Sequence, residues 1–318
     1  MTCRDAVLAE TDGQGGGVGG QMALKYVLVT PARNEAALIE QTIQSVISQT
    51  ILPKRWVIVS DGSTDDTDRI VEKYLAGRNW LELVRRPVQK ERNFAAKVEA
   101  FNEGYARLSG LDFDVIGCMD ADVTFEADFF EFLIGRFERN PRLGVAGTHY
   151  VEGDFHSYND SFMNVEHVNG ACQLFRRACF EDIGGYVPIP GGGIDWVAVT
   201  TARMKGWQTR SYSERVFRHH RKIGTAGTSE LGSRFRYGKK DYFLGGDPLW
   251  QLLRCGYQMT KPPYLLGGLS LMAGYTWCWL SGQQRPISKE LVSFHRGEQR
   301  RRMREMLASP GAVLRRPT

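Results

Sequence analysis

Two aspartates, Asp120 and Asp122, directly follow the apolar run 115–119 and are separated by one residue. Side chains two positions apart on an extended chain point to the same side, so both carboxylates project together from the end of a strand. Hard divalent cations prefer such oxygen ligands, and open α/β sheets bind ligands beyond the carboxyl ends of their strands. The pair therefore predicts a site for a cation that carries nucleotide phosphates, although an isolated Asp-x-Asp is also typical of a solvated turn.

Two further strand–helix units precede this pair and are expected to position it. The apolar run 25–30 leads into a polar segment, 31–35, and then into a helix with apolar residues at helical spacing. A second run, 55–60, ends at Asp61, and Ser63 or Thr64 is expected to cap the helix that follows. Three such units with polar residues at their ends predict an α/β sheet with a ligand site at one edge.

Three later segments add candidate residues. Arg92, Asn93 and Lys97 lie at the start of an expected helix over 93–108, where a cation would offset phosphate charge. Asp195 follows three consecutive glycines and precedes an expected helix over 196–205. Two adjacent histidines, 219 and 220, follow the last expected strand.

Six short motifs, given in chain order at the end of this paragraph, resemble those of the family-2 glycosyltransferases, which have a GT-A fold. The resemblance covers about residues 23 to 225 and is closest to enzymes of bacterial polysaccharide biosynthesis. It implies a Rossmann-like mixed sheet flanked by helices, a nucleotide-diphosphate sugar as donor, a divalent cation, and inversion at the anomeric carbon. The motifs are Thr30-Pro31-x-x-Asn34-Glu35, Asp61-Gly62-Ser63-Thr64-Asp65, Arg92-Asn93-x-x-Ala96-Lys97, Asp120-Ala121-Asp122, Asn169-Gly170-Ala171 and Gly192-Gly193-Ile194-Asp195-Trp196.

The resemblance implies roles for most of these residues. Asp61 is expected to accept a hydrogen bond from a ring N–H of the nucleobase, as in uracil. The implied cation, Mg²⁺ or Mn²⁺, bridges the diphosphate and stabilises the charge of the leaving group. The residues expected to bind the nucleotide are Thr30, Pro31, Ala32, Glu35, Asp61, Arg92, Asn93, Lys97 and Asp120. The expected metal ligands are Asp120, Asp122 and His220, with His219 as the second choice of histidine.

Asp195 is the candidate general base, which would take the proton of the acceptor hydroxyl. The family's usual motif has Glu-Asp at this point, whereas this chain has Ile194-Asp195, which leaves Asp195 as the only carboxylate there. Simpler structural roles remain open for three residues. Asp195 suits a helix N-cap, Glu35 suits the first turn of a helix, and Arg92 suits a solvated basic face.

Composition and cysteine usage narrow the class of protein. The chain has 318 residues, 42% of them hydrophobic and 24% charged, which is ordinary for a globular protein. Its six cysteines are scattered without metal-site spacing, which argues against a disulfide framework or zinc site and favours a reducing cytosol. We expect residues 1–22 to form a disordered Gly-rich tail without a secretory signal, 23–228 to form the GT-A domain, and 229–318 to form a basic helical region.

The last of these regions suggests contact with a membrane. Residues 229–318 contain fifteen Lys and Arg against six Asp and Glu, a balance of +9 within a chain of net charge +5. Basic residues lie on both sides of the uncharged apolar segment 264–280, which has aromatic residues at both ends. This pattern favours a helix in the interface of an anionic membrane over one that spans it, with packing on the domain as the structural alternative. The expected location is the cytoplasmic face of the inner membrane, or the cytoplasm if the helix belongs to the core.

Together these features predict an inverting glycosyltransferase that uses a nucleotide-sugar donor and a lipid-linked or polysaccharide acceptor. No aromatic–basic RNA-binding motif is present, so nucleic acid is not an expected partner. One alternative is a nucleotidyltransferase, but the segment after the first strand lacks the glycines of that class. The other is a catalytically inactive scaffold of the same fold, which four retained aspartates argue against.

Overall fold

The computed structural model describes residues 24–88, 94–153, 155–157, 165–189, 192–221 and 229–308. Its first part alternates strands and helices, because short apolar runs are separated by amphipathic segments. These elements are β1 (Tyr26–Ala32), α1 (Ile39–Ile47), β2 (Arg55–Asp61), α2 (Thr67–Leu75), β3 (Leu81–Arg86), α3 (Phe94–Ala106) and β4 (Val115–Met119). The second part consists of β5 (Val123–Phe125), α4 (Phe129–Arg139), β6 (Leu143–Glu152), β7 (Phe155–His156), β8 (Cys172–Arg176), α5 (Arg177–Asp182), α6 (Ile194–Met204) and β9 (Gln208–His219).

All the described strands belong to one mixed sheet in the order β3-β2-β1-β4-β8-β6-β9-β5, with β7 paired to β6. The strands β3, β2, β1 and β4 are parallel, so their carboxyl ends meet at one edge. β8 runs antiparallel to β4 and β6, and β5 runs antiparallel to β9. The polar segments after β1, β2 and β4 therefore lie together, and the expected α/β fold is confirmed.

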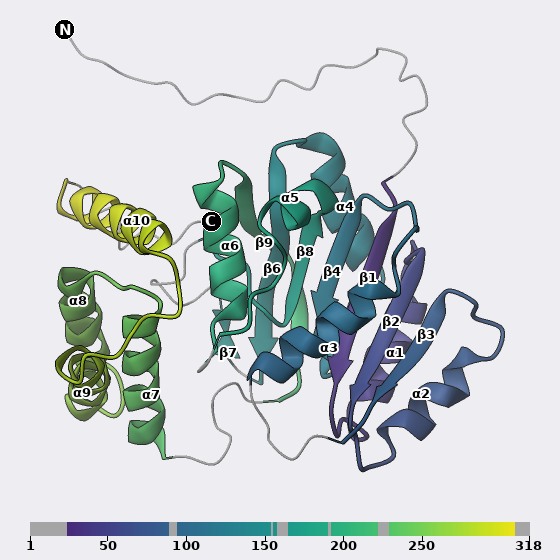
Figure 1. The fold of residues 1–318 in the computed structure, drawn as a ribbon, viewed down its shortest axis with the longest axis horizontal. Coiled ribbons are helices and arrows are strands. Elements are labelled where there is room, and N and C mark those ends of the chain that lie inside the picture. The colour runs from purple at the N-terminus through teal and green to yellow at the C-terminus, as the bar shows by residue number, and fades with distance from the viewer. Residues whose placement is uncertain are drawn as a thin grey trace, which may run out of the picture.

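Helices cover both faces of the sheet, and each face has its own buried cluster. The α1 and α4 helices pack on one face, where Ile43 and Phe130 join Trp56 of β2. The α3, α5 and α6 helices cover the other face, seen at the front in Figure 1, where Phe101 and Val197 contact the alternate residues of the strands. This alternation fixes which residues at the strand ends point into the site.

Four helices follow the sheet and lie at its β9 side (Figure 1): α7 (Glu230–Phe243), α8 (Pro248–Met259), α9 (Leu266–Leu280) and α10 (Lys289–Ala308). Glycines let α7 and α9 approach closely, since a Cβ at Gly238 would lie 1.9 Å from the Leu271 carbonyl oxygen. The last helix returns to α6, where the Arg203 Nε donates to Glu298 at 2.8 Å. These helices thus contact the sheet domain, and the boundary at residues 228 and 229 stays a prediction.

The apolar segment 264–280 forms α9, which has two different faces. One face is buried on its neighbours and includes Leu271, Tyr275 and Cys278, whereas Trp277 and Trp279 are exposed. In the described part of the chain, no helix combines the length and apolarity that crossing a bilayer requires. Packing on the domain therefore accounts for one side of this helix, and contact with a membrane stays a prediction for the other.

The N-terminus of α2 is capped differently from the expectation. Ser63 and Thr64 do not cap α2; the Asp65 carboxylate accepts from the Thr67 backbone N–H at 3.0 Å instead. Ser63 and Thr64 are engaged by Asn34, whose backbone N–H and side-chain oxygen tie the ends of β1 and β2 together.

The described cysteines are buried and carry free thiols, as their scattered positions predicted.

Candidate active site

A cavity of about 230 Å³ opens at the shared carboxyl edge of β1, β2 and β4, and we call it the strand-end cavity. Most of the residues that the sequence analysis assigned to the nucleotide and metal line it. These are Pro31, Ala32, Glu35, Asp61, Lys97, Asp120 and Asp122, and Arg33, Ala96, Ala100, Ala121 and Arg221 complete the wall. Residues separated by almost two hundred positions in the chain thus meet in one place.

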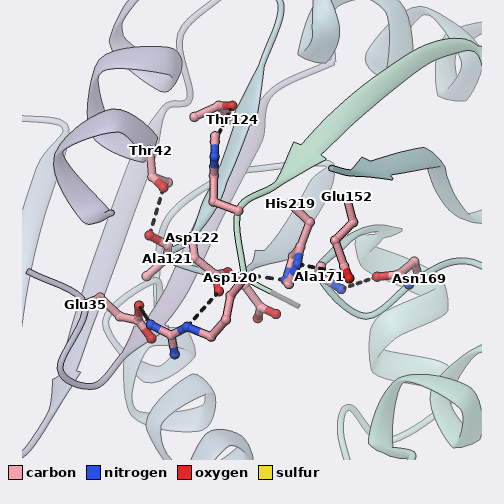
Figure 2. A network of polar contacts seen from close by, with 12 residues as sticks. Glu35, Thr42, Asp120, Ala121, Asp122, Thr124, Glu152, Asn169, Ala171 and His219 are labelled. Carbon is pink, nitrogen blue, oxygen red and sulfur yellow. Dashed lines mark hydrogen bonds and ion pairs between the residues drawn. The ribbon is translucent and has the colours of Figure 1, made fainter. Parts of the chain in front are cut away.

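The Asp120–Asp122 turn is held by its neighbours on both sides. The Asp120 backbone N–H donates to the Ala171 carbonyl at 2.9 Å, which ties the turn to the segment before β8. On the other side the Thr42 hydroxyl of α1 donates to the Ala121 carbonyl at 2.8 Å. Figure 2 shows both acids emerging from this turn toward Glu35 and His219. The carboxylates therefore start from a fixed backbone.

Asp120, Asp122 and His219 form a group with the donor set of a metal site. One ligand atom from each lies within 4.8 Å of the others. The Asp122 Oδ1 is buried without a hydrogen-bond partner among the described residues and faces the His219 Nε2 at 3.5 Å. Burial, reinforced by the neighbouring Asp120 charge, raises the pKa of Asp122 above its usual value. An orphaned, charge-crowded carboxylate is the environment that a divalent cation would relieve, so these residues fit the expected metal.

The structure places His219, and not His220, beside the two aspartates. Successive residues of β9 point to opposite sides, and His219 is the inward one. The His220 ring instead pairs with the Thr124 hydroxyl at 2.9 Å, so the predicted ligand role passes to its neighbour. Behind His219, the Glu152 carboxylate lies 3.7 Å from Nδ1 (Figure 2). At this distance Glu152 adds negative charge beside the imidazole without a hydrogen bond to it, and nothing in the sequence around Glu152 indicated its place there.

Two cations offset the charge of the acidic group. The Lys97 ammonium donates to Asp120 at 2.5 Å, which raises the pKa of this lysine even though its burial opposes the shift. The Arg221 guanidinium donates to Glu35 at 2.5 Å and lies 3.8 Å from Asp122. Burial nevertheless raises the pKa of Glu35 to about 7. Glu35 precedes α1 by four residues, so it is not the first-turn acid of that helix.

Asp61 ends β2 and is held by Arg86, a residue that the sequence analysis missed. The Arg86 guanidinium donates to Asp61 at 2.5 Å and to Glu99 at 3.0 Å. Only its place at the end of the neighbouring strand β3 brings it there. Thr30 is fully buried and its hydroxyl accepts from the Trp56 indole at 3.0 Å, so its side chain does not line the cavity. The predicted nucleotide contacts Arg92 and Asn93 lie outside the described residues.

Asp195 lies in the first turn of α6, behind a glycine turn. Gly193 is the N-cap residue and has a φ of 101°, a left-handed conformation that favours glycine, so Asp195 is not the cap. Gly170 leaves room for the carboxylate, because a Cβ there would lie 2.7 Å from the Asp195 Cβ. Burial alone would raise the pKa of Asp195, but Lys240, His167, the Trp196 backbone N–H and Lys97 together lower it. The group is therefore an ionised base at neutral pH.

Lys97 connects Asp195 electrostatically to the metal-site group, because its charge acts on both Asp120 and Asp195. Asp195 itself lines a second and larger cavity of about 490 Å³, bordered by α6, α7, α8 and α10, which we call the helix cavity. The Asp195 carboxylate thus lines one cavity, and Asp120 and Asp122 line the other. Two cavities could each hold one of two substrates.

Comparison with known proteins gives a consistent picture. Residues 27–164 match the model of Glycosyl transferase family 2. Poly-beta-1,6-N-acetyl-D-glucosamine synthase of Staphylococcus epidermidis is 31% identical over 171 residues, which cover 48% of this chain and 39% of that protein. Glucosyl-dolichyl phosphate glucuronosyltransferase of Haloferax volcanii is 25% identical over 187 residues, which cover 52% of this chain and 56% of that protein. The matches thus span little more than half, or less, of these curated relatives.

Solved structures share the fold at low identity. The mannosyltransferase PcManGT from Pyrobaculum calidifontis, in complex with GDP-Man and Mn²⁺, has a TM-score of 0.54 at 17% identity and covers 91% of this chain and 82% of its own. GalNAc-T7 with UDP, GalNAc and Mn²⁺ has a TM-score of 0.58 at 13% identity and covers 94% of this chain and 59% of its own. At such identities the likeness establishes the fold alone.

Proposed function

The chain belongs to glycosyl transferase family 2 through residues 27–164, and from this premise we propose a metal-dependent, inverting sugar transfer from a nucleotide-diphosphate donor. The observation that carries the proposal is the strand-end cavity, which collects Asp61, Lys97, Asp120 and Asp122 from three separate motifs. Asp195 of a further motif is linked to it electrostatically through Lys97. A scaffold without activity has no need for an ionised carboxylate and a set of cation ligands that share one lysine.

The donor is held through its nucleotide in this proposal. Asp61, kept in place by Arg86, accepts the ring N–H of the base at the end of β2. Lys97 and Arg221 now pair with Asp120 and Glu35, and with Arg33 they are the cations that line this cavity and could contact the diphosphate. Asp120, Asp122 and His219 would hold the divalent cation, which would supply Lewis-acid stabilisation of the leaving diphosphate and offset the repulsion between the two aspartates.

Asp195 performs the proton transfer. Its carboxylate takes the proton of the acceptor hydroxyl, and the acceptor oxygen forms a bond to the anomeric carbon. The bond from that carbon to the diphosphate oxygen breaks, and the nucleoside diphosphate leaves with the electron pair. A single displacement inverts the configuration, so an α-linked donor gives a β-linked product. The lowered pKa of Asp195 keeps the base in its reactive form at neutral pH.

The test is nucleotide release by the purified full-length protein from a panel of nucleotide sugars in Mn²⁺ or Mg²⁺. We expect one donor to be turned over and chelator to stop the reaction. Asp122→Asn should abolish release and weaken metal-dependent nucleotide binding. Asp195→Asn should lower turnover about 10²-fold or more with little change in donor affinity. Full activity in chelator would refute the metal site, and a product with retained configuration by NMR would refute the mechanism.

The acceptor and the location complete the proposal. The names of the two curated relatives, a polysaccharide synthase and an enzyme acting on a dolichyl phosphate-linked sugar, support a glycan or lipid-linked acceptor. Exposed apolar side chains on α8 and α9 support peripheral attachment to a membrane on its cytoplasmic face. These side chains are Leu249, Leu252, Leu253, Leu265, Leu266, Leu269, Trp277, Trp279 and Leu280.

A further inference from the structure

The helix cavity is lined by one face of each helix around it. Residues at helical spacing on α7, including Arg234, Tyr237 and Lys240, face residues of α8 and α10 across the space, with Asp195 at the α6 side. The volume of about 490 Å³ is within the range that holds a small ligand or part of a larger one. Asp195, the candidate base, lines this cavity, and none of its lining residues also lines the strand-end cavity, where the nucleotide is proposed to bind. It is therefore placed to receive the second substrate.

The wall of the helix cavity is positively charged. It contains seven Arg and Lys side chains and four carboxylates, an excess of three positive charges. Two of the carboxylates are already neutralised, Glu298 by Arg203 and Asp241 by Arg254. Within the described residues, no carboxylate oxygen lies within 4.0 Å of a side-chain nitrogen of Arg234, Lys240, Lys261 or Arg302. Burial lowers the pKa of Arg302, although the charges of Glu166, Glu298 and Glu305 act in the opposite direction. A ligand with negative charge would compensate these cations.

The α8 helix is amphipathic in the reverse of the usual sense. Its inward face carries Gln251, Arg254 and Gln258, which line the cavity. Its outward face carries Leu249 and Leu252, which are 61% and 57% exposed, together with other leucines of α8 and α9. A helix on a water-soluble domain normally buries its leucines and exposes its charges. The polar interior suits a charged ligand, and the apolar exterior beside it suits a lipid phase.

Lys240 connects this cationic wall to the base. Its Cε lies 3.1 Å from the point where a Cβ at Gly193 would stand, two residues before Asp195. The Lys240 charge is also the strongest influence that lowers the Asp195 pKa. An anionic group bound at Lys240 would therefore place the adjoining part of the same molecule at the Asp195 carboxylate. The geometry pairs an anchor for the anion with a base for a nearby hydroxyl.

We propose that the helix cavity binds a phosphate-bearing lipid acceptor, with the phosphate at Lys240, Arg234 and Arg302 and the lipid chain against the exposed leucines of α8 and α9. The proposal rests on the function proposed above, since Asp195 then acts on a hydroxyl of the sugar that this phosphate carries. It specifies the acceptor as an anionic, lipid-linked molecule instead of a neutral glycan. The phosphate would add negative charge to a wall that carries an excess of three positive charges.

The test is equilibrium binding of farnesyl phosphate to the full-length protein in detergent, measured by isothermal titration calorimetry. We expect farnesol, which lacks the phosphate, and inorganic phosphate, which lacks the chain, to bind at least about tenfold more weakly. Lys240→Met should weaken farnesyl phosphate binding about tenfold or more, and Lys240→Arg should retain it. Lys239→Met, the same change at the adjacent position outside the cavity lining, should bind as the wild type does.

Several outcomes would overturn the proposal. Equal binding of farnesol and farnesyl phosphate would remove the role of the phosphate, and unchanged binding by both Lys240→Met and Arg234→Met would remove the cationic wall. Direct binding of a soluble acidic oligosaccharide such as oligogalacturonate, with no binding of farnesyl phosphate, would assign the cavity to an acidic glycan. Metal-dependent nucleotide binding, measured on the same samples, reports on the donor site separately. If the wild-type protein shows no metal-dependent nucleotide binding, the function proposed above is contradicted instead.

Discussion

Gly170→Ala tests whether catalysis depends on the position of Asp195. The added methyl group would lie 2.7 Å from the Asp195 Cβ and 2.9 Å from its Oδ2. Carbon atoms in contact settle at about 3.5–4.0 Å, so the carboxylate must retreat by roughly 1 Å. A displacement of about 1 Å in a reacting group can lower the rate about 10²-fold. We therefore expect turnover to fall by about two orders of magnitude without any catalytic group being removed.

The assay is the initial rate of nucleotide release with saturating donor and Mn²⁺, in which water takes the place of the acceptor hydroxyl. Nucleoside diphosphate affinity, measured by calorimetry, should change little, because the strand-end cavity is not altered. Gly297→Ala is the matched control, since a Cβ at this exposed position of α10 meets nothing within 4 Å. That substitution should keep full activity and stabilise the helix by up to about 1 kcal/mol.

A double variant distinguishes displacement of Asp195 from any other effect of the added methyl group. If the methyl group acts only by displacing Asp195, Gly170→Ala combined with Asp195→Asn should be no slower than Asp195→Asn alone. Independent, multiplied losses would mean that Gly170 matters for another reason. Wild-type turnover in Gly170→Ala, with the protein folded, would refute the assignment of Asp195 as a positioned base.

Three other predictions follow from the geometry. Lys240 lowers the pKa of Asp195, so this carboxylate becomes protonated only at a pH below the usual pKa of an aspartate. Lys240→Met should raise this pKa and therefore move the acidic limb of the pH–kcat profile to higher pH. Arg203→Met breaks an ion pair whose side chains are 13% and 12% exposed, and should cost about 3 kcal/mol in urea unfolding. Arg177→Met, whose pair is 42% and 50% exposed, should cost less than about 1 kcal/mol. Leu252→Glu should reduce sedimentation with anionic vesicles at low salt, and unchanged sedimentation would contradict membrane contact through α8.

The strand–helix units and the placement of the site were predictable because both depend on local patterns. Apolar runs of strand length located β1, β2 and β4, and parallel strands bring their carboxyl ends to one edge. This is sufficient to gather Asp61, Asp120 and Asp122. The partners of these residues were not predictable. Arg86 reaches Asp61 only because β3 lies beside β2, and Glu152 reaches His219 only through the pairing of β6 with β9.

The choice between the adjacent histidines illustrates the same limit. A sequence gives the alternation of side chains along β9, but not which of the two sets faces the site. The pairing of Val123 with His219 settles it, because β5 follows the Asp120–Asp122 turn directly. The register between two strands therefore decides which imidazole stands beside Asp122. Such a decision needs the neighbouring strand as well as the motif.

The α8 helix shows why the sequence understated the apolar surface. The apolar part of the predicted membrane contact was assigned to residues 264–280, because they form an uninterrupted apolar segment flanked by basic residues. The leucines of α8 recur at helical spacing, at positions 249, 252 and 253, as in any helix that packs its leucines inward. Here the helix cavity takes the polar side, and Leu249, Leu252 and Leu253 face outward. Burial of a leucine side chain is worth about 1.5–3 kcal/mol, so this orientation forgoes stability unless an apolar phase covers them. A polar ligand within the cavity and a lipid surface outside it would together account for the reversed helix.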